Sequence, residues 1–287
     1  MTLTHVITML IDISIVLIVC GLGLKTEKGD AIYLLSRPSL LLRSLASMNV
    51  VMAFVAVAIA VLFTLPFSVK LALVALAISP VPPILPVKQQ RAGGSQCYAV
   101  SLLLFASLTA VVLAPFAVGL TAAFFGRDAS IAPLAVAKII LISVIAPLLT
   151  GIFVRHRFPA AAKRLARPVS TIGTAVLIVA MLPVLSVATK EIWTIVGDGA
   201  VLALAAFAIV GLVVGHWLGG PEPENRTVLA LATSTRHPGV ALAIANLNFP
   251  DERTTFAIVL YHLAIGAIVS LPYVKWRRPA QLISPTG

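Results

Sequence analysis

The residues best suited to chemistry gather in one stretch, 231–246, which is apolar enough to form most of a membrane crossing. Its middle holds three hydroxyls, a fixed cation, a titratable ring and two helix breakers: Thr233, Ser234, Thr235, Arg236, His237, Pro238 and Gly239. Pro238 lacks an amide proton and clashes with the preceding turn, so we expect the helix to break there. The freed backbone groups must face protein or a water-filled cavity at membrane depth. We interpret this stretch as half of a solute-binding site.

Composition indicates a polytopic membrane protein. Hydrophobic residues make up 60% of the 287 and charged residues 11%, and the mean hydropathy is +1.06, whereas about a quarter of a soluble domain is charged. The net charge of +11 lies in short joins between apolar runs, where it sets topology. Nucleic acid is therefore not an expected partner. Cys20 and Cys97 form no metal or redox motif, and we expect no metal and no cofactor.

About 20 apolar residues span the hydrocarbon core of a bilayer. This rule predicts an all-α protein with nine crossings, at 3–24, 44–65, 69–92, 95–124, 133–154, 169–188, 196–218, 226–247 and 252–274. Lysine and arginine concentrate in the joins after the first and fifth crossings, where the third crossing joins the fourth (Lys88 and Arg91), and in the C-terminal tail. Because such residues stay on the cytoplasmic side, the N-terminus is predicted outside and the C-terminus inside the cell.

A second break is predicted in the third crossing, where Pro80-Val81-Pro82-Pro83-Ile84-Leu85-Pro86 should exclude regular helix over its whole length. The third and eighth crossings run in opposite directions in this topology. Interrupted crossings at corresponding places of two halves point to the binding site of a secondary transporter with inverted repeats. The halves are 1–132, with the broken helix 69–92, and 133–287, with the broken helix 226–247. Pro82 and Pro83 thereby become candidate site residues.

Several segments in order resemble the bile acid:sodium symporter superfamily. They are Gly21-Leu22-Gly23-Leu24, Arg37-Pro38-Ser39-Leu40-Leu41-Leu42-Arg43, the proline cluster with Arg91-Ala92-Gly93-Gly94, Ala146-Pro147-Leu148-Leu149-Thr150-Gly151, and the eighth crossing. The resemblance implies a divergent, bacterial-type member in the inner membrane of a bacterium. It also implies a core domain from about 44–124 and 196–274 and a panel domain from about 3–24 and 133–188. Two crossed broken helices would lie in the core domain, with the solute between the domains.

The sodium ligands of the family do not carry over to this chain. Family members that bind sodium use a Ser-Asn pair at the first break, hydroxyls on the next helix, and a Glu and a Gln at the second. The resemblance aligns these with Leu85 and Pro86, with Ala99 and Leu103, and with Thr233 and His237; a one-residue shift would move the Glu to Ala232. Neither alignment offers the carboxylate that helps to hold sodium in a low dielectric. We therefore do not expect sodium coupling by the usual route, although hydroxyls 233–235 and freed carbonyls could form a weak site.

Arg236 has three interpretations. A cation at this depth costs about 2.5–3.5 kcal/mol on insertion scales. Its planar fork suits a carboxylate of an anionic solute. Alternatively, it replaces the missing sodium as a tethered cation that holds the half-helices together, or it reaches an interface and pairs structurally. Its place beside a break favours the first two.

The neighbouring polar residues have two roles each. His237 either bonds the solute or carries a proton, or is a hydrogen-bonded structural histidine. His262 in the last crossing either faces the core site or is a packed, hydrogen-bonded histidine. The hydroxyls 233–235 bind solute or cap the broken helix. The amides after Pro238 begin a helix and attract anions, so Gly239 joins the candidate site. Asp12 is a deep carboxylate that either pairs with a cation or lies at the interface.

The function predicted from these residues is secondary transport of a small organic anion across a cell membrane by alternating access, with proton coupling as one form. A passive channel or a non-transporting solute receptor on the same scaffold is the alternative. An intramembrane enzyme is disfavoured, because the chain lacks H-E-x-x-H and G-x-S-x-G and has one deep carboxylate. No catalytic residues are therefore predicted.

Overall fold

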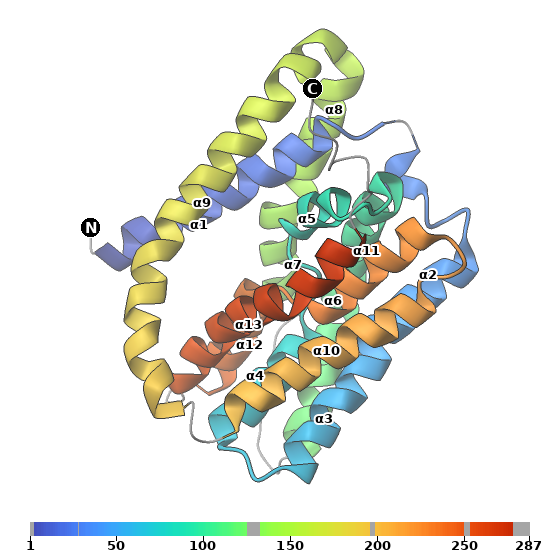
Figure 1. The fold of residues 1–287 in the computed structure, drawn as a ribbon. Helices are drawn as coiled ribbons and strands as arrows, with labels where there is room; N and C mark the ends of the chain where they lie inside the picture. Colours follow the sequence, from blue (N-terminus) through green and yellow to red (C-terminus); the bar gives the residue numbers. More distant parts are fainter. Residues whose placement is uncertain (1–2, 28, 125–132, 196–198, 250–252, 278–287) are drawn as a thin grey trace, which may run out of the picture.

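Helices make up the regular structure of this computed structural model, which describes residues 3–27, 29–124, 133–195, 199–249 and 253–277 (Figure 1). The first half contains α1 (Leu3–Gly23), the 3-10 turn η1 (Asp30–Ile32), α2 (Pro38–Leu45), the π-helical η2 (Ala46–Val51), α3 (Met52–Leu62), α4 (Phe67–Ile78), α5 (Leu85–Arg91) and α6 (Gln96–Phe124). The second half contains α7 (Pro133–Ile140), the π-helical η3 (Leu141–Ile145), α8 (Ala146–Arg157), α9 (Pro159–Ile195), α10 (Ala200–Leu218), α11 (Pro223–Ser234), α12 (Pro238–Asn248) and α13 (Arg253–Arg277).

The helices are those of a polytopic membrane protein. Among the described residues, five helical segments are long and apolar enough to cross a membrane, namely Pro38–Leu62, Gln96–Phe116, Ala137–Arg157, Ala200–Leu218 and Thr254–Arg277. Met9–Gly23 and Phe67–Ile78 are shorter apolar helices. The total of nine crossings and the orientation stay predictions.

Two predicted joins are wrong, because the chain is helical there. The second predicted crossing begins with α2 at Pro38 rather than at residue 44. The sixth begins with α9 at Pro159 rather than at residue 169. Proline is well placed at the first position of a helix, where its missing amide proton is not needed. The alanine, lysine, arginine and leucine residues that follow Pro159 favour helix. The basic residues expected in a loop therefore lie mostly on α9, and Phe158 alone separates it from α8.

Helix α1 packs on α8 and α9 along one side of the molecule (Figure 1). Glycines allow this contact, because a Cβ on Gly23 would lie 2.4 Å from the carbonyl oxygen of Leu148. A Cβ on Gly151 would lie 2.3 Å from the carbonyl oxygen of Cys20. Small residues let membrane helices approach closely and gain van der Waals contact.

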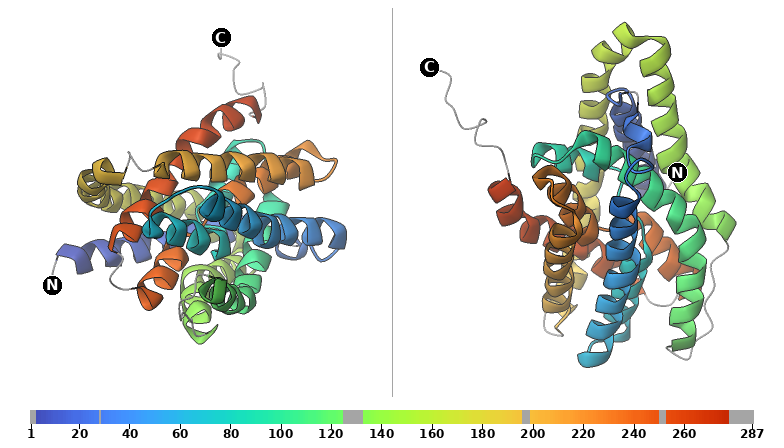
Figure 2. Two further views of the ribbon diagram at one scale, coloured as in Figure 1. Left: turned by 90° about the horizontal axis from the view of Figure 1, so that it is seen from below. Right: turned by 90° about the vertical axis from the view of Figure 1, so that its right-hand side faces the viewer.

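A second set of helices packs around α10, which contacts α3, α11 and α13. The right-hand view of Figure 2 shows α3 and α10 running alongside one another. Gly211, Gly215 and Gly219 recur every four residues on α10 and face α11, and a Cβ on Gly215 would lie 2.5 Å from the carbonyl oxygen of Leu229. Helix α13 also touches α9 of the first set. The assignment of these sets to core and panel domains, and their inverted repeat, stay predictions.

Both expected helix breaks are present. Helix α4 ends at Ile78, and the chain is extended at Ser79 before α5 begins at Leu85. Helix α11 ends at Ser234, and residues 235–237 are not helical. The first break is shorter than predicted, because Pro86 lies inside α5. Its position in the first turn explains this, since the amides there have no partner within the helix.

Candidate solute-binding site at the two helix breaks

The two breaks meet in the folded chain. Helix α4 lies beside α12, and α5 lies beside α11, so the two broken segments run in opposite directions. The backbone N–H of His237 donates to the carbonyl oxygen of Pro80 at 2.8 Å. The side chain of Gln89 on α5 donates to the carbonyl oxygen of Val228 on α11 at 2.8 Å. Backbone groups released by one break are thus used by the other.

Arg236 lies at the centre of this arrangement and is fully buried. Its Nη2 donates to the carbonyl oxygen of Met48 at 2.7 Å, and its Nη1 donates to that of Ser79 at 3.4 Å. Met48 lies in the π-helical η2, where the change of hydrogen-bond step leaves a carbonyl without its usual partner. Ser79 follows the last residue of α4. The guanidinium therefore binds two carbonyls that regular helix would have satisfied.

The electrostatic environment of Arg236 comes from helix ends. Helix α4 ends one residue before Ser79, and α11 ends two residues before Arg236. Each C-terminus carries about half a negative charge, so together they match one cation. Within the described part of the chain, no carboxylate lies at ion-pair distance from Arg236. This arrangement favours the tethered-cation interpretation over direct contact with a solute.

The two histidines of the candidate site are buried. Nδ1 of His237 accepts from the backbone N–H of Val240 at 3.4 Å and so caps α12. Among the described residues, Nε2 of His237 and both ring nitrogens of His262 have no hydrogen-bond partner. The His262 ring packs edge-on against Phe207, with centroids 5.7 Å apart. These nitrogens are polar groups left open in the protein interior.

The hydroxyls differ in what they bind. The Thr233 hydroxyl lies 3.0 Å from that of Ser47 on η2, linking the second break to the π-helical turn. Ser234 donates back to the carbonyl oxygen of Leu231 at 3.2 Å. Thr235 is half-buried in extended backbone between the helices. Thr233 and Ser234 are thus engaged with protein, and Thr235 is the most accessible of the three.

Accessibility divides the candidate residues. Thr235 and Pro238 are half-buried, and Gly239 is exposed. The buried candidates are Thr233, Ser234, Arg236, His237, His262, Pro82 and Pro83. The segment from Thr235 to Gly239 is therefore the accessible part of the candidate site, and the remaining candidates are buried. Asp12 is exposed on α1, which packs on α8 and α9.

The positions aligned with the family's sodium ligands at the first break and on the next helix are buried and apolar. Leu85, Ala99 and Leu103 are 2%, 1% and 0% exposed. Leu85 and Leu103 fill space with methyl groups that provide no oxygen for a cation. The fixed charge of Arg236 lies beside the remaining hydroxyl, Thr233.

Sequence reasoning missed three contributors to the site. Met48 and Ser47 lie in η2 and contact Arg236 and Thr233. The sequence of this apolar segment does not distinguish a π-helical turn from ordinary α-helix. Lys88 was assigned to a join that sets topology, but it lies in α5, half-buried, and donates to the Ser270 hydroxyl of α13 at 2.6 Å. Because Lys88 closely follows the proline cluster, the sequence did indicate that it lies close to the first break.

The fold and the site define a polytopic α-helical membrane protein in which two broken helices meet around a buried cation. A family model described as the sodium bile acid symporter family matches residues 12–195. The chain belongs to this family. The match includes the first break and stops before α11, so the break that holds Arg236 lies beyond it.

Curated relatives include three ileal sodium/bile acid cotransporters. The protein of Oryctolagus cuniculus is 28% identical, that of Homo sapiens 27% and that of Cricetulus griseus 26%, each over 148 residues. These alignments cover 48% of this chain and 42% of each relative. The chain thus spans less than half the length of the curated relatives that it matches.

Proposed function

We propose that the protein is a secondary transporter of a small organic anion in a bacterial inner membrane. Family membership, the two breaks that meet, and a buried cation with no carboxylate partner support this function. The helices around α10 would move as a core domain against a panel domain formed by α1 and the helices within residues 133–188. The solute would bind between the two domains, at the surface from Thr235 to Gly239.

The carboxylate of the solute would bind at the start of α12. Within this first turn, Pro238 has no amide proton and Val240 already donates to His237. The exposed Gly239 amide therefore remains as the donor, aided by the positive end of α12. The Thr235 hydroxyl supplies a second contact. Arg236 would stay buried beneath this surface and attract the solute through its positive charge.

Arg236 would replace the family's sodium ion. The observation that carries this proposal is the full burial of its guanidinium between two helix C-termini, with hydrogen bonds to the carbonyls of Met48 and Ser79. A sodium ion in the same place would bring one positive charge and bind carbonyl oxygens. A covalently attached cation does this permanently, so solute binding would not require sodium.

Uptake into proteoliposomes tests the function. A panel of labelled organic acids is assayed with sodium, pH and membrane potential varied separately. We expect saturable uptake of at least one acid, undiminished when choline replaces sodium. Absence of saturable uptake for every anion would refute the transporter; steady conductance without saturation indicates a channel, and tight binding without flux indicates a receptor.

Proton coupling would depend on the buried histidines. His237 and His262 have open ring nitrogens close to the solute surface, and an inward proton gradient would charge one of them as the solute enters. Uptake should then rise with an imposed inward proton gradient in the wild type and lose this response in His262→Gln. A response that His262→Gln and His237→Gln both retain would exclude these histidines as the coupling groups.

A further inference from the structure

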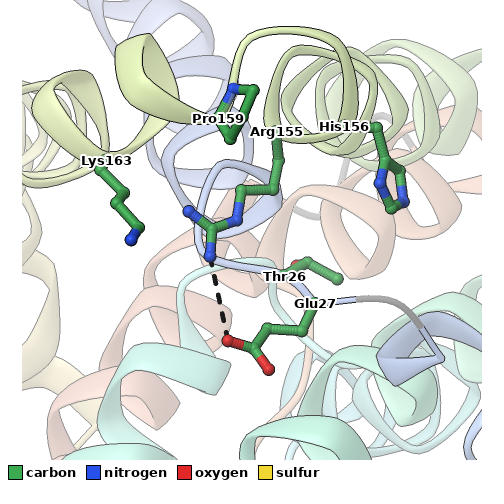
Figure 3. A pocket seen from close by; sticks show the side chains of 6 residues that line it. All are labelled: Thr26, Glu27, Arg155, His156, Pro159 and Lys163. Atoms are coloured by element: carbon green, nitrogen blue, oxygen red, sulfur yellow. Dashed lines mark ion pairs between the residues drawn. The ribbon is translucent and has the colours of Figure 1, made fainter.

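A pocket of about 490 Å³ lies where α8 and α9 meet the chain after α1, and Thr26, Glu27, Arg155, His156, Pro159 and Lys163 line it (Figure 3). Figure 3 shows Arg155 and Lys163 reaching from α8 and α9 toward the side where Glu27 lies. These helices pack on α1 rather than on α11 and α12. The pocket is thus separate from the site at the two breaks.

Positive charge in this pocket exceeds its negative charge. Nη2 of Arg155 lies 3.8 Å from Oε1 of Glu27, whose side chain is 73% exposed. Glu27 is the single carboxylate of the lining, and Lys163 is a second cation there. Asp30 is a second carboxylate nearby; it does not line the pocket, and its Oδ2 accepts from the Glu27 amide and the Gln96 side chain.

The cations continue beyond the lining. Lys25 directly precedes Thr26, and its pKa is lowered from the usual lysine value by burial and by the charges of Arg91 and Arg167. Arg167 lies one helical turn after Lys163 on α9. Positive groups therefore crowd one another here instead of being neutralised. Such crowding is relieved when an anion enters.

Helix-end stabilisation explains only part of this cluster. Arg155 and His156 lie in the last turn of α8, where cations interact favourably with the helix dipole. Lys163 is the fifth residue of α9, near the positive end of that helix, so the dipole gives it no such benefit. The helix dipole therefore does not account for the charge of Lys163.

Apolar side chains are also exposed on the segment of chain that carries the pocket residues of α8 and α9. Phe158, between α8 and α9, is 57% exposed, and Phe153 on α8 is 64% exposed. Exposed phenylalanine rings can contact acyl chains, and basic side chains near helix ends reach the headgroups. The surface thus offers a cationic pocket for a phosphate and apolar contacts for acyl chains.

We propose that this pocket binds a phosphate group, supplied by the headgroup of an anionic lipid or by free phosphate, through Arg155 and Lys163. Basic pockets between membrane helices bind such headgroups, and anionic surfaces attract each nearby lysine or arginine. The exposed Phe153 and Phe158 favour the lipid as the source.

The test uses the full chain in detergent and measures the melting temperature as ligand is added. Phosphatidylglycerol and inorganic phosphate are the two probes, and phosphatidylcholine is the uncharged comparison. We expect phosphatidylglycerol to raise the melting temperature of the wild type, and phosphatidylcholine to leave it unchanged. Protection by inorganic phosphate alone, to the same extent, would identify free phosphate as the source.

Charge-matched variants decide where the anion binds. The double variant Arg155→Gln with Lys163→Gln should bind the anion roughly thirtyfold more weakly, about fivefold for each lost cation. A control with Arg43→Gln and Lys275→Gln loses the same charge from exposed positions outside the pocket and should bind like the wild type. Glu27→Gln removes the carboxylate of the lining and should strengthen binding roughly fivefold.

The opposite sign expected for Glu27→Gln separates binding from misfolding, because a poorly folded variant would not bind more tightly. No protection of the wild type by either probe would overturn the proposal. Full protection of the double variant, or weaker binding by Glu27→Gln, would also overturn it.

Discussion

Two regions of the molecule hold positive charge that no carboxylate fully balances, and they treat it in opposite ways. At the helix breaks, Arg236 is fully buried and donates to two backbone carbonyls. At the junction of α8 and α9, Arg155 and Lys163 line an open pocket and face one exposed carboxylate. The comparison teaches that a cation with fixed backbone partners can serve as part of the structure, whereas a cation beside open space is free to bind a mobile anion.

The largest effect is expected at Arg236. Arg236→Ala leaves the carbonyls of Met48 and Ser79 unpaired between two negative helix ends. Removing a partner from a buried, hydrogen-bonded charge site destabilises by about 3–5 kcal/mol, so we expect a strongly lowered melting temperature and loss of uptake. Thermal unfolding in detergent and flux in proteoliposomes measure the two effects.

Sodium provides the control for this variant. The vacated site can accept a free cation, so sodium should raise the melting temperature of Arg236→Ala above its value in choline and leave the wild type unchanged. Equal stability of Arg236→Ala and the wild type would show that the buried guanidinium is not a structural cation, and the contrast between the two regions would fail.

The second-largest loss of stability is expected at Gly215, where α10 packs closely against α11. A Cβ on Gly215 would lie 2.5 Å from the carbonyl oxygen of Leu229, so Gly215→Ala must push α10 away from the broken helix. Overpacking of this kind costs about 1–3 kcal/mol. Gly266→Ala is the matched control, because a Cβ there meets no atom within 4 Å. If both variants melt at the same temperature, the close packing of α10 on α11 does not support the break.

The smallest effect is expected at Lys25, beside the basic pocket. Burial and the charges of Arg91 and Arg167 lower the pKa of Lys25 in the folded chain. The unfolded chain therefore binds more protons between that lowered pKa and the ordinary lysine value, and stability contributed by this group rises with pH across that window. Lys25 is partly exposed, so the effect is discounted for solvent screening.

Lys25→Gln removes this repulsion. We expect a slightly higher melting temperature at neutral pH and a flatter pH dependence of stability near the lysine range, measured by thermal unfolding at several pH values. Arg43→Gln, an exposed control, should leave the pH dependence unchanged. A lower melting temperature for Lys25→Gln would show that this charge is compensated rather than crowded.

The helix breaks were predictable because proline acts locally. Pro238 and the cluster 80–86 remove hydrogen-bond donors whatever surrounds them, and both breaks lie where the sequence places them. The starts of the second crossing and of α9 were missed because Pro38 and Pro159 were placed inside the joins between crossings, whereas they begin helices. A proline signals a boundary, but the neighbouring residues decide on which side the helix lies.

The partners of Arg236 could not be predicted from the sequence. Met48 contributes a carbonyl because η2 is π-helical, and residues 46–51 look like ordinary apolar helix. The burial of the guanidinium depends on contacts between segments more than 150 positions apart in the chain. The basic pocket likewise depends on α9 starting at Pro159, which brings Lys163 onto a helix beside Arg155.

The most direct test of the central claim is the initial rate of organic-acid uptake into proteoliposomes when choline replaces sodium on both sides. A permanently attached guanidinium between the two helix ends predicts the same rate in either salt. Uptake that stops without sodium and returns when it is restored would contradict this account, because a free ion would then be doing what we assign to Arg236.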